Sequence, residues 1–491
     1  MHKFSNADRD FFSVLDRVVY GNPFSDRRDR LIQRLAPDSA KGDLDADRDT
    51  LARAVEPRLR PYEDSSALDR LGADDRRLVR SGFLYVCYQR HVPPIDRLIG
   101  QESSQRESVD RIAKSVIADL VGHGIDEALA VRYFALFFQL RRAFHFIGRS
   151  LTGNCESMRK LRSALWDNIF THDMREFETG LWKRMEDFST LILGETGTGK
   201  GAAAAAIGRS EFIPYLPAER RFAANFADSF IAINLSQFAE SLIESELFGH
   251  RKGAFTGAIE HHQGVFERCN AHGALFLDEI GEASVPIQIK LLQVLQERTF
   301  TPLGSHEKKR FAGRVIAATN RPLGGLRASG RFRDDFYYRL CSDVIEVPTL
   351  RQRIEESARE LEELVRLLVT RIGGEENAER AAFVLEALER DLPRGYPWPG
   401  NVRELEQAVR RILLTGRYAA GLSAESGSED DRLADMARAG TLSAQELLGR
   451  YCALLYRRFG TYAEVAERTG LDRRTARKYV VDYSAATRAA P

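Results

Sequence analysis

The clearest chemical signal in the chain is a glycine-rich loop, GETGTGK, at residues 194–200. It follows the apolar run LILG and precedes an alanine-rich stretch, which is the strand–loop–helix setting of a phosphate-binding loop. Glycines let backbone N–H groups turn inward, the helix start attracts anions, and the lysine supplies a cation for the β and γ phosphates. We expect nucleotide contacts from Gly194, Glu195, Thr196, Gly197, Thr198, Gly199, Lys200 and Gly201.

Two adjacent carboxylates end a second apolar run, ALFLDE. The serine or threonine that often follows the loop lysine and binds Mg²⁺ is here Gly201, so the ion needs another ligand. Because side chains alternate along a strand, Asp278 and Glu279 are expected to point in opposite directions. We assign Asp278 to Mg²⁺, largely through water, and Glu279 to general-base activation of a water molecule. Asn320 ends the run RVIAATN and suits a contact to the γ-phosphate or the water, so ATP and Mg²⁺ are the expected cofactors.

A basic helix pair is expected near the C-terminal end, in YAEVAERTGLDRRTARKYV, residues 462–480. Gly470 suits the turn, Asp472 suits an N-cap, and Leu471 suits the angle between the helices. The first helix would pack through Ala463, Val465 and Ala466. A solvated basic hairpin is the alternative, but basic residues at the start of a second helix favour contacts with DNA. The expected DNA-binding residues are Arg473, Arg474, Thr475, Arg477 and Lys478.

Length and composition indicate a multidomain globular protein. The chain has 491 residues, of which 29% are charged and 43% apolar, with a formal net charge of +1. Nucleic-acid binding therefore needs a local basic patch. The five cysteines are scattered and suit reduced thiols. The N-terminal stretch lacks a signal-peptide pattern, and the most apolar run, residues 133–140, is too short to cross a bilayer, so we expect a cytoplasmic protein without membrane contacts.

The remaining elements must position these residues. From residue 191, short apolar runs alternate with helical stretches, which predicts a parallel sheet with crossover helices on both faces. The first 150 residues and those after Pro348 have helical spacing, and the acidic stretch GLSAESGSEDD is typical of a linker. The fold class is thus α/β, with a mostly helical N-terminal domain and a C-terminal helix-turn-helix.

Several side chains invite a chemical role but suit a structural one better. Cys87 and His91 have i, i+4 spacing, yet no further ligand is evident nearby, so a metal site is not expected. The helix that carries Phe134, Phe137, Phe138, Phe144 and Phe146 is expected to pack into a core, with a ligand pocket as the alternative. The same structural interpretation applies to a group with no metal-binding spacing: His261, His262, Cys269 and His272.

The order of motifs resembles the bacterial enhancer-binding proteins, the AAA+ ATPases that activate sigma-54-dependent transcription. The resemblance covers residues 157–414 and the C-terminal helices. It rests on SMRKLR, GETGTGK, ESELFGHRKGAFTGA, GALFLDEIGE, LLQVLQERTF, VIAATN, GRFRDDFYYRL, VPTLRQR and YPWPGNVREL. It implies a regulatory domain (1–150), an AAA+ α/β subdomain (151–350), an AAA+ helical lid (351–420), a linker (421–440) and a Fis-type DNA-binding domain (441–491).

The resemblance also implies roles that spacing does not reveal. Arg333 and Arg339 match arginine fingers that reach a neighbouring subunit's ATP, which implies a hexameric ring when active, with a dimer possible at rest. Arg403 matches the sensor arginine of the lid, and Asn234 matches the asparagine that holds Glu279. The partners would be enhancer DNA and sigma-54 RNA polymerase, with the closed complex remodelled by ATP hydrolysis. The polymerase contact would come from Gly253, Ala254, Phe255, Thr256, Gly257 and Ala258, with the two glycines as hinges.

Three departures from the family pattern stand out. Glutamate usually follows the loop lysine, where this chain has Gly201. Two insertions, residues 168–188 and 212–229, suit subunit-contact or regulatory elements, or surface loops without function. The alternatives to the activator are an AAA+ ATPase that remodels another protein–DNA complex, and a DNA-binding repressor with a vestigial ATP site.

Overall fold

The computed structural model describes residues 4–37, 44–63, 65–100, 106–418, 433, 436–437 and 442–489. The chain forms two compact units, one of residues 1–382 with 396–410 and one of residues 383–395 with 411–491. The acidic stretch 421–431, which we predicted as part of a linker, lies outside the described residues. The bounds of the five domains inferred from the sequence stay predictions.

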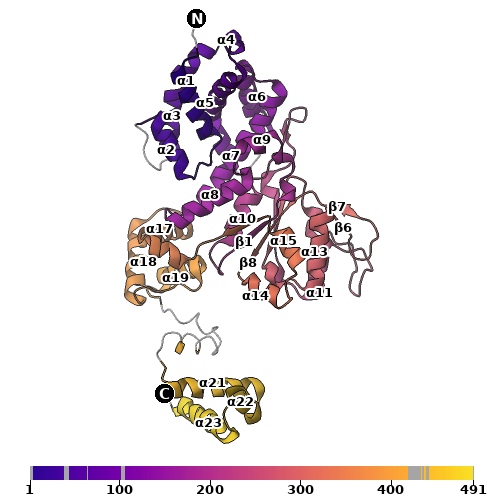
Figure 1. The fold of residues 1–491 in the computed structure, drawn as a ribbon, viewed down its shortest axis with the longest axis vertical. Helices are drawn as coiled ribbons and strands as arrows, with labels where there is room; N and C mark the ends of the chain where they lie inside the picture. Colours follow the sequence, from indigo (N-terminus) through magenta and orange to yellow (C-terminus); the bar gives the residue numbers. More distant parts are fainter. Residues whose placement is uncertain are drawn as a thin grey trace. The chain divides into compact units, whose positions relative to one another are not determined.

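A parallel sheet forms the centre of the first unit (Figure 1). Its strands, in spatial order, are β4 (Phe230–Asn234), β5 (Ala274–Asp278), β8 (Arg314–Thr319), β1 (Thr190–Leu193) and β9 (Asp343–Glu346). Every neighbouring pair is parallel. The parallel α/β sheet that the apolar runs predicted is confirmed.

Apolar side chains cover both faces of this sheet. Along β1 and β8 they alternate between two hydrophobic clusters: Leu191 and Ala317 belong to one, and Ile192 and Ala318 belong to the other. This alternation follows from the two-residue period of a strand. The helices after β1 are α10 (Lys200–Gly208), α11 (Glu240–Phe248), α12 (Val265–Arg268), α13 (Val285–Glu297), α14 (Leu323–Ala328) and α15 (Asp334–Leu340). Two short strands, β6 (Thr299–Phe300) and β7 (Lys309–Arg310), form an antiparallel hairpin.

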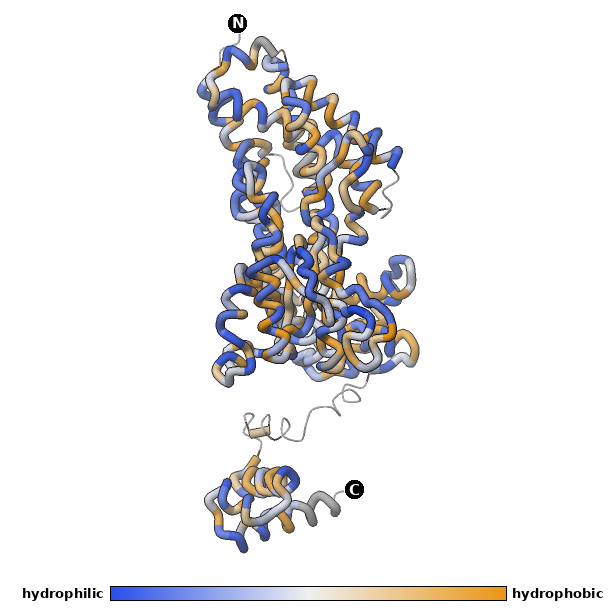
Figure 2. Tube along the Cα trace, turned by 90° about the vertical axis from the view of Figure 1, so that its right-hand side faces the viewer, coloured by the Kyte–Doolittle hydropathy of each residue, from blue (hydrophilic) through white to orange (hydrophobic). Residues whose placement is uncertain are grey.

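The N-terminal region is helical, as predicted. Its helices are α1 (Asn6–Val19), α2 (Asp26–Leu35), α3 (Leu44–Leu59), α4 (Ser65–Asp69), α5 (Ala73–Gly100), α6 (Arg106–Gly122) and α7 (Glu127–Ser150). Figure 2 shows hydrophilic and hydrophobic residues alternating along them, as expected of amphipathic helices. Capping residues define where two of these helices begin: Ser5 and Asp8 form a capping box before α1, and Asp126 caps α7.

The N-terminal helices share one core with the sheet. A single hydrophobic cluster runs from Leu84 to Val347 and includes α7, α8 (Glu156–Phe170), α9 (Met174–Thr179) and α10. Within it, the fully buried Arg142 donates hydrogen bonds to the carbonyls of Arg209 (2.8 Å) and Glu211 (2.7 Å), just after α10. A cation at this position also suits the negative end of α10. Helix α7 thus packs on the end of the phosphate-loop helix.

The second insertion is part of this contact. It forms a small hairpin of β2 (Tyr215–Leu216) and β3 (Arg221–Phe222). The ring of Phe222 stacks on Phe138 of α7 at a centroid distance of 4.5 Å. Tyr215 and Arg220 both donate to Asp110 of α6. The insertion is therefore packed against the N-terminal helices, while its functional role stays a prediction.

After the sheet come the short helix α16 (Leu350–Glu356) and three longer ones: α17 (Arg359–Gly373), α18 (Ala378–Asp391) and α19 (Asn401–Thr415). The C-terminal helices α21 (Ala444–Phe459), α22 (Tyr462–Thr469) and α23 (Arg473–Ala489) enclose a small core around Cys452, Val465 and Ala476. Within the described part of the chain, no helix is both long and apolar enough to cross a membrane.

Candidate functional site

The phosphate loop connects β1 to α10 as predicted. Gly199 has a φ of 106° and Gly197 a φ of 79°, in the left-handed region that favours glycine. A Cβ atom at position 197 would lie 2.2 Å from the carbonyl oxygen of Gly400, so a side chain has no room there. Gly201, by contrast, is exposed, and nothing lies within 4 Å of the place its Cβ would take. Nothing in the structure explains glycine at that position.

The side chain of Lys200 is hydrogen-bonded to this loop. Its side chain is buried, and its Nζ donates to the carbonyls of Gly194 (2.9 Å) and Glu195 (3.1 Å). Burial lowers the pKa of Lys200, although the carboxylates of Glu279 and Asp278 act in the opposite direction. The structure thus brings the loop lysine within electrostatic range of both predicted carboxylates.

The two predicted carboxylates lie at different positions relative to strand β5. Asp278 is the last residue of β5, whereas Glu279 follows the strand with a left-handed φ of 54°. The amide of Asn320 donates to Thr196 Oγ1 in the phosphate loop (2.8 Å), and its backbone N–H donates to Glu279 Oε2 (3.4 Å). Asn320 therefore connects the predicted general base to the phosphate loop.

Asn234 contacts a different carboxylate from the one expected. Its Nδ2 donates to Asp278 Oδ2 at 3.2 Å, and the resemblance had implied Glu279 as its partner. The strand register explains this, because β4 and β5 pair Asn234 directly with Asp278. Glu279 lies beyond the strand, so the alternation expected for the two carboxylates does not apply to it.

Asn401 is a site residue that the sequence analysis missed. It is fully buried and left-handed, with a φ of 53°. Its Nδ2 donates to Glu195 Oε2 (3.1 Å) and to the carbonyl of Thr196 (3.0 Å), while its Oδ1 accepts from the N–H of Leu350 (2.8 Å). The preceding Pro-Gly signals a turn, but only the fold shows that this turn reaches the phosphate loop.

Arg403 lies beside the same turn. A Cβ built on Gly197 would be 3.0 Å from the Cβ of Arg403, and the Arg403 charge acts on Lys200. The structure therefore places the predicted sensor arginine next to the phosphate loop of its own chain.

A cavity of about 640 Å³ opens at the carboxyl edge of the sheet. Residues 193–195, 319–323 and 344–349 line it, together with one face of α8. Ligands of open parallel sheets bind at this edge, and the volume falls in the range of small-molecule sites. The cavity offers space for a nucleotide next to the phosphate loop.

The two predicted arginine fingers have partners elsewhere in the chain. Arg333 pairs with Asp335 (2.7 Å), and Arg339 donates to the carbonyl of Leu295 (2.9 Å). Both flank or belong to α15. Their assignment to a neighbouring subunit's nucleotide stays a prediction.

The segment Gly253–Ala258 is an exposed loop after α11. A hydrogen bond joins its first and last residues: the N–H of Gly253 donates to the carbonyl of Ala258 (2.8 Å). Gly253 and Gly257 have φ values of 82° and 104°, which explains glycine at both positions. Phe255, at the tip, is 37% exposed, with its ring edge against His250. The loop therefore presents an aromatic side chain to solvent.

The C-terminal helices match most of the expected helix-turn-helix. Gly470 takes the left-handed turn, and Asp472 caps α23 by accepting from the N–H groups of Arg474 (2.9 Å) and Thr475 (3.0 Å). Val465 is buried, but Ala463 is exposed, so its expected packing role is wrong. The basic residues of α23 that face solvent are Arg473, Arg474, Arg477 and Lys478, while Thr475 is half-buried.

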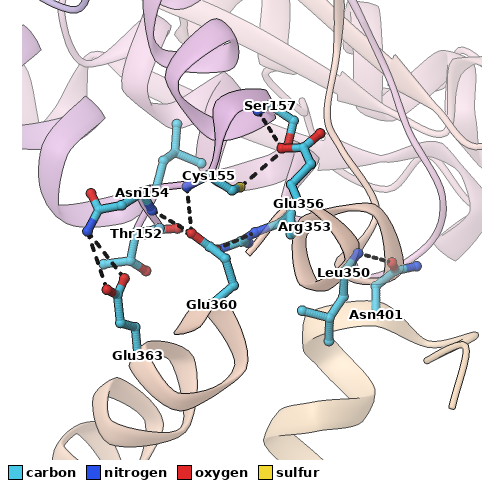
Figure 3. Close-up of polar contacts among 12 residues, drawn as sticks. Thr152, Asn154, Cys155, Ser157, Leu350, Arg353, Glu356, Glu360, Glu363 and Asn401 are labelled. Carbon is cyan, nitrogen blue, oxygen red and sulfur yellow. Dashed lines mark hydrogen bonds and ion pairs between the residues drawn. The ribbon is translucent and has the colours of Figure 1, made fainter. Parts of the chain in front are cut away.

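A buried polar joint connects the segment before α8 to α16 and α17 (Figure 3). Arg353 forms an ion pair with Glu360 (2.7 Å), and both side chains are almost fully buried. Glu360 also accepts from the N–H of Cys155 (2.8 Å), and Arg353 donates to the carbonyl of Thr152 (2.7 Å). Burial alone would raise the pKa of Glu360, but these hydrogen bonds lower it.

The aromatic residues of α7 do pack into a core, as predicted, yet a cavity lies beside them. Phe134, Phe138 and Phe146 are buried in the shared cluster. Phe137 and Phe144 also line a cavity of about 380 Å³ in the N-terminal region.

The structure contradicts the premise that Cys87 and His91 have no further potential ligand nearby. Asp119 places a third potential metal ligand beside Cys87 and His91. The folded chain therefore supplies the further ligand that sequence spacing did not reveal. Among the described residues, no such group includes His261, His262, Cys269 or His272.

Known proteins are similar in sequence to the part of the chain that carries these motifs. The sigma-54 interaction domain family matches residues 174–346. The transcriptional regulatory protein ZraR of Klebsiella oxytoca is 38% identical over 295 residues, which cover 59% of this chain and 62% of ZraR. The DNA-binding transcriptional regulator NtrC of Rhizobium meliloti is 34% identical over 345 residues, 67% of each chain. The chain thus spans less than two thirds of the length of ZraR.

Among solved structures, NtrX from Brucella abortus in complex with ATP aligns with a TM-score of 0.41 and 20% identity over 78% of this chain and 81% of NtrX. The fold assignment rests instead on the chain's own sheet order, with the phosphate-loop strand between β8 and β9, and on the family match. This is an AAA+ core with a nucleotide site of the ATPase type. The chain belongs to the family of sigma-54-dependent transcriptional activators.

Proposed function

We propose that this protein is an ATP-dependent transcription activator that binds enhancer DNA and remodels the closed complex of sigma-54 RNA polymerase. One observation carries the proposal: a phosphate loop, a carboxylate pair and an exposed Gly253–Ala258 loop occur together on one AAA+ core of the sigma-54 activator family. The alternatives, another remodelling target or a vestigial ATP site, predict different outcomes in the experiment below.

In this proposal the phosphate loop holds the phosphates of ATP. Backbone N–H groups of residues 194–199 bind them, and Lys200 neutralises the β and γ phosphates. Asp278 would hold Mg²⁺ through water, and the ion would neutralise charge on the phosphates. The carboxylate of Asp278 accepts a hydrogen bond from Asn234 Nδ2 (3.2 Å), which orients it, and a carboxylate is a suitable ligand for a hydrated hard cation.

Glu279 is the proposed general base. Its left-handed backbone turns the carboxylate toward Asn320, and Asn320 bonds Thr196 of the phosphate loop. This arrangement orients a water molecule between the carboxylate and the γ-phosphate for attack. The proton of that water passes to Glu279, and the γ-phosphate leaves ADP as inorganic phosphate.

A ring of subunits completes the proposed site. Arg333 and Arg339 would reach the γ-phosphate in a neighbouring subunit, so hydrolysis requires assembly into a hexamer. The Arg333–Asp335 ion pair is easily broken, because exposed ion pairs contribute little to stability. Arg403 would report nucleotide state to the helices that follow it.

The Gly253–Ala258 loop would contact sigma-54 through Phe255 and Thr256, both exposed. The left-handed glycines at either side allow the loop to change its backbone path when nucleotide state changes. Helix α23 would bind the enhancer through its basic face, with phosphate contacts that position the protein and base contacts that select the site.

The test measures ATP hydrolysis and promoter opening in the same preparations of full-length protein. Wild type is expected to open a sigma-54 promoter only with hydrolysable ATP. Thr256→Ala is expected to hydrolyse ATP but fail to open the promoter, and Thr301→Ala, which also removes an exposed threonine hydroxyl, serves as its control.

Three results would count against the proposal. Promoter opening by Thr256→Ala would remove the loop from the mechanism. Hydrolysis without any opening by wild type would favour another remodelling target. DNA binding without hydrolysis would indicate a repressor with a vestigial site.

A further inference from the structure

Two helices of the N-terminal region carry matched pairs of metal-ligand side chains. Helix α5 presents Cys87 and His91, one turn apart, and α6 presents Asp119 and His123, also one turn apart. His123 lies just past the end of α6. Residues at i and i+4 share a helix face, so each pair forms a small patch. Helices α5 and α6 pack together, and the patches meet.

The distances bring the ligand atoms of three residues together, and His123 lies beside the third, Asp119. We call these four residues the Cys87 cluster: Cys87, His91, Asp119 and His123. One ligand atom each from Cys87, His91 and Asp119 lies within 4.8 Å of the others. His91 Nε2 is 3.3 Å from Asp119 Oδ2, and His123 Nε2 is 3.6 Å from Asp119 Oδ1. Ligands of a tetrahedral Zn²⁺ ion are separated by about 3.3–3.8 Å, given metal–ligand bonds of roughly 2.0–2.3 Å.

Burial distinguishes this cluster from a patch of surface charges. Cys87 is 1% and His91 7% exposed. The side chains of Asp119 and His123 are 16% and 21% exposed, so an ion can enter from the α6 side. A buried thiol and imidazole with an open rim offer ligands that are positioned before the ion arrives, which lowers the entropic cost of binding.

Asp119 already has protein partners, and these define the competing interpretation. Arg90 NH1 donates to both of its oxygens, at 2.8 and 2.9 Å, and the thiol of Cys87 hydrogen-bonds to it. In that interpretation Asp119 is only the shared acceptor of its neighbours. The Arg90 side chain is 54% exposed, however, and can turn to solvent at little cost when a cation replaces it.

His123 is not committed to a fixed orientation by hydrogen bonds. Its Nδ1 is buried and has no hydrogen-bond partner within the described part of the chain. Its ring stacks on Phe83 at a centroid distance of 4.3 Å, which holds the plane of the imidazole. Nε2 is the ring nitrogen that faces Asp119, and it is available to bind an ion there.

We infer that the Cys87 cluster is a binding site for a divalent transition-metal ion of borderline softness, with Zn²⁺ as the expected occupant. One thiolate, one imidazole and one carboxylate, with the imidazole of His123 next to the carboxylate, match the ligands of Zn²⁺, whereas Mg²⁺ and Ca²⁺ prefer oxygen atoms only. On binding, Cys87 Sγ forms a bond to the ion and releases its proton to solvent. The ion cross-links α5 to α6. This inference does not depend on the function proposed above.

The test uses untagged full-length protein, reduced and freed of metal with a chelator. Equilibrium dialysis against Zn²⁺ is expected to give one bound ion per chain. Titration with Co²⁺ is expected to give thiolate-to-metal charge-transfer absorption and the strong visible bands of a tetrahedral site. Cys87→Ser and His91→Gln are each expected to weaken binding by well over about tenfold, since even the loss of outer-shell partners costs roughly 10–100-fold.

Two further variants keep the test decisive. Cys155→Ser removes another buried free thiol and is expected to leave binding and the charge-transfer band unchanged. Arg90→Ala removes the competitor for Asp119, leaves all four residues of the Cys87 cluster in place, and is expected to tighten Zn²⁺ binding. Thermal unfolding of the metal-free proteins shows which variants are folded.

Two outcomes would overturn the inference. In the first, neither wild type nor Arg90→Ala binds one Zn²⁺ ion per chain. The other is a folded Cys87→Ser protein that keeps wild-type affinity.

Discussion

The nucleotide site and the buried polar joint use similar side chains for different ends. In the nucleotide site the charges of Lys200, Asp278 and Glu279 act on one another, and a cavity lined by residues 193–195 and 319–323 adjoins the phosphate loop. In the joint, Arg353 and Glu360 face each other, and backbone groups of residues 152–155 take up their remaining bonding capacity. Charges that are paired and enclosed stabilise the fold, whereas charges beside a phosphate loop are available for chemistry.

This comparison predicts that substitutions in the two regions affect different measurements. Variants of the nucleotide site should change turnover and leave stability nearly unchanged. Variants of the joint should change stability first. Asn401 contacts both regions, because it bonds the phosphate loop and the N–H of Leu350 at the start of α16, so its variants should affect both measurements.

The largest expected effect is on turnover. Glu279→Gln removes the proposed base without changing the shape of the side chain, and general-base catalysis contributes about 10²–10⁴-fold. We expect ATP turnover to fall by that factor while ATP affinity stays within about threefold of wild type, since binding rests on the phosphate loop. Steady-state hydrolysis and nucleotide titration measure the two quantities. Glu282→Gln, which changes a carboxylate that pairs with Arg321, is the control and should keep its turnover.

The next effect is on stability. Glu360→Gln leaves Arg353 as a buried cation without a counter-charge, and breaking a buried ion pair from one side costs about 3–5 kcal/mol. We expect the free energy of unfolding of the first unit to fall by this amount in denaturant titrations. Glu363→Gln, which changes the more exposed neighbour that bonds Asn154, should cost far less. Equal losses in the two variants would mean that the joint does not act as a buried ion pair.

Asn401→Ala is expected to have a smaller effect, and this effect appears both in nucleotide affinity and in the stability of the joint. The substitution leaves the buried N–H of Leu350 without its partner, which costs about 1–3 kcal/mol, and it removes the hydrogen bond to the carbonyl of the exposed Thr196. Asn401→Gly separates two causes, because glycine keeps the left-handed backbone but also lacks the side chain. We expect both variants to lose stability and nucleotide affinity, with Asn401→Ala the worse. A loss confined to stability would assign Asn401 to the joint alone.

The smallest effect is the pH dependence of the joint. The pKa of Glu360 is lower in the folded chain than its ordinary value of about 4.3 in unfolded chains, so its ionised form stabilises the fold above that pH. This contribution is lost as the pH falls through the lowered folded pKa. The stability difference between wild type and Glu360→Gln should therefore be constant near neutral pH and shrink below about pH 4. A constant difference down to pH 3 would contradict the pairing.

Much of the nucleotide site was predictable because its parts are contiguous in sequence. The loop 194–200 carries its strand, glycines and lysine in one motif, and Asp278 with Glu279 ends a single apolar run. The parallel sheet followed from the same apolar runs. The loop Gly253–Ala258 was identified as a motif, although its proposed role came only from the family resemblance.

Other features depend on residues that only the fold brings together. Asp119 and His123 are some thirty residues from Cys87 and His91, so no spacing rule joins them. The partner of Asn234 follows from strand register, and the contact of Asn401 with the phosphate loop follows from the path of a turn. The insertion at 212–229 packs on α6 and α7 through Tyr215, Arg220 and Phe222, which its sequence did not indicate.

The central claim, that the nucleotide site drives the Gly253–Ala258 loop against sigma-54, can be tested by one binding measurement. Purified sigma-54 is mixed with wild type and with Phe255→Ala, each in the presence of ADP or of ADP with aluminium fluoride, which mimics the transferring phosphoryl group. We predict a stable complex only for wild type with the aluminium fluoride mimic. Binding that is the same with both nucleotides, or that survives in a folded Phe255→Ala protein, would contradict the claim.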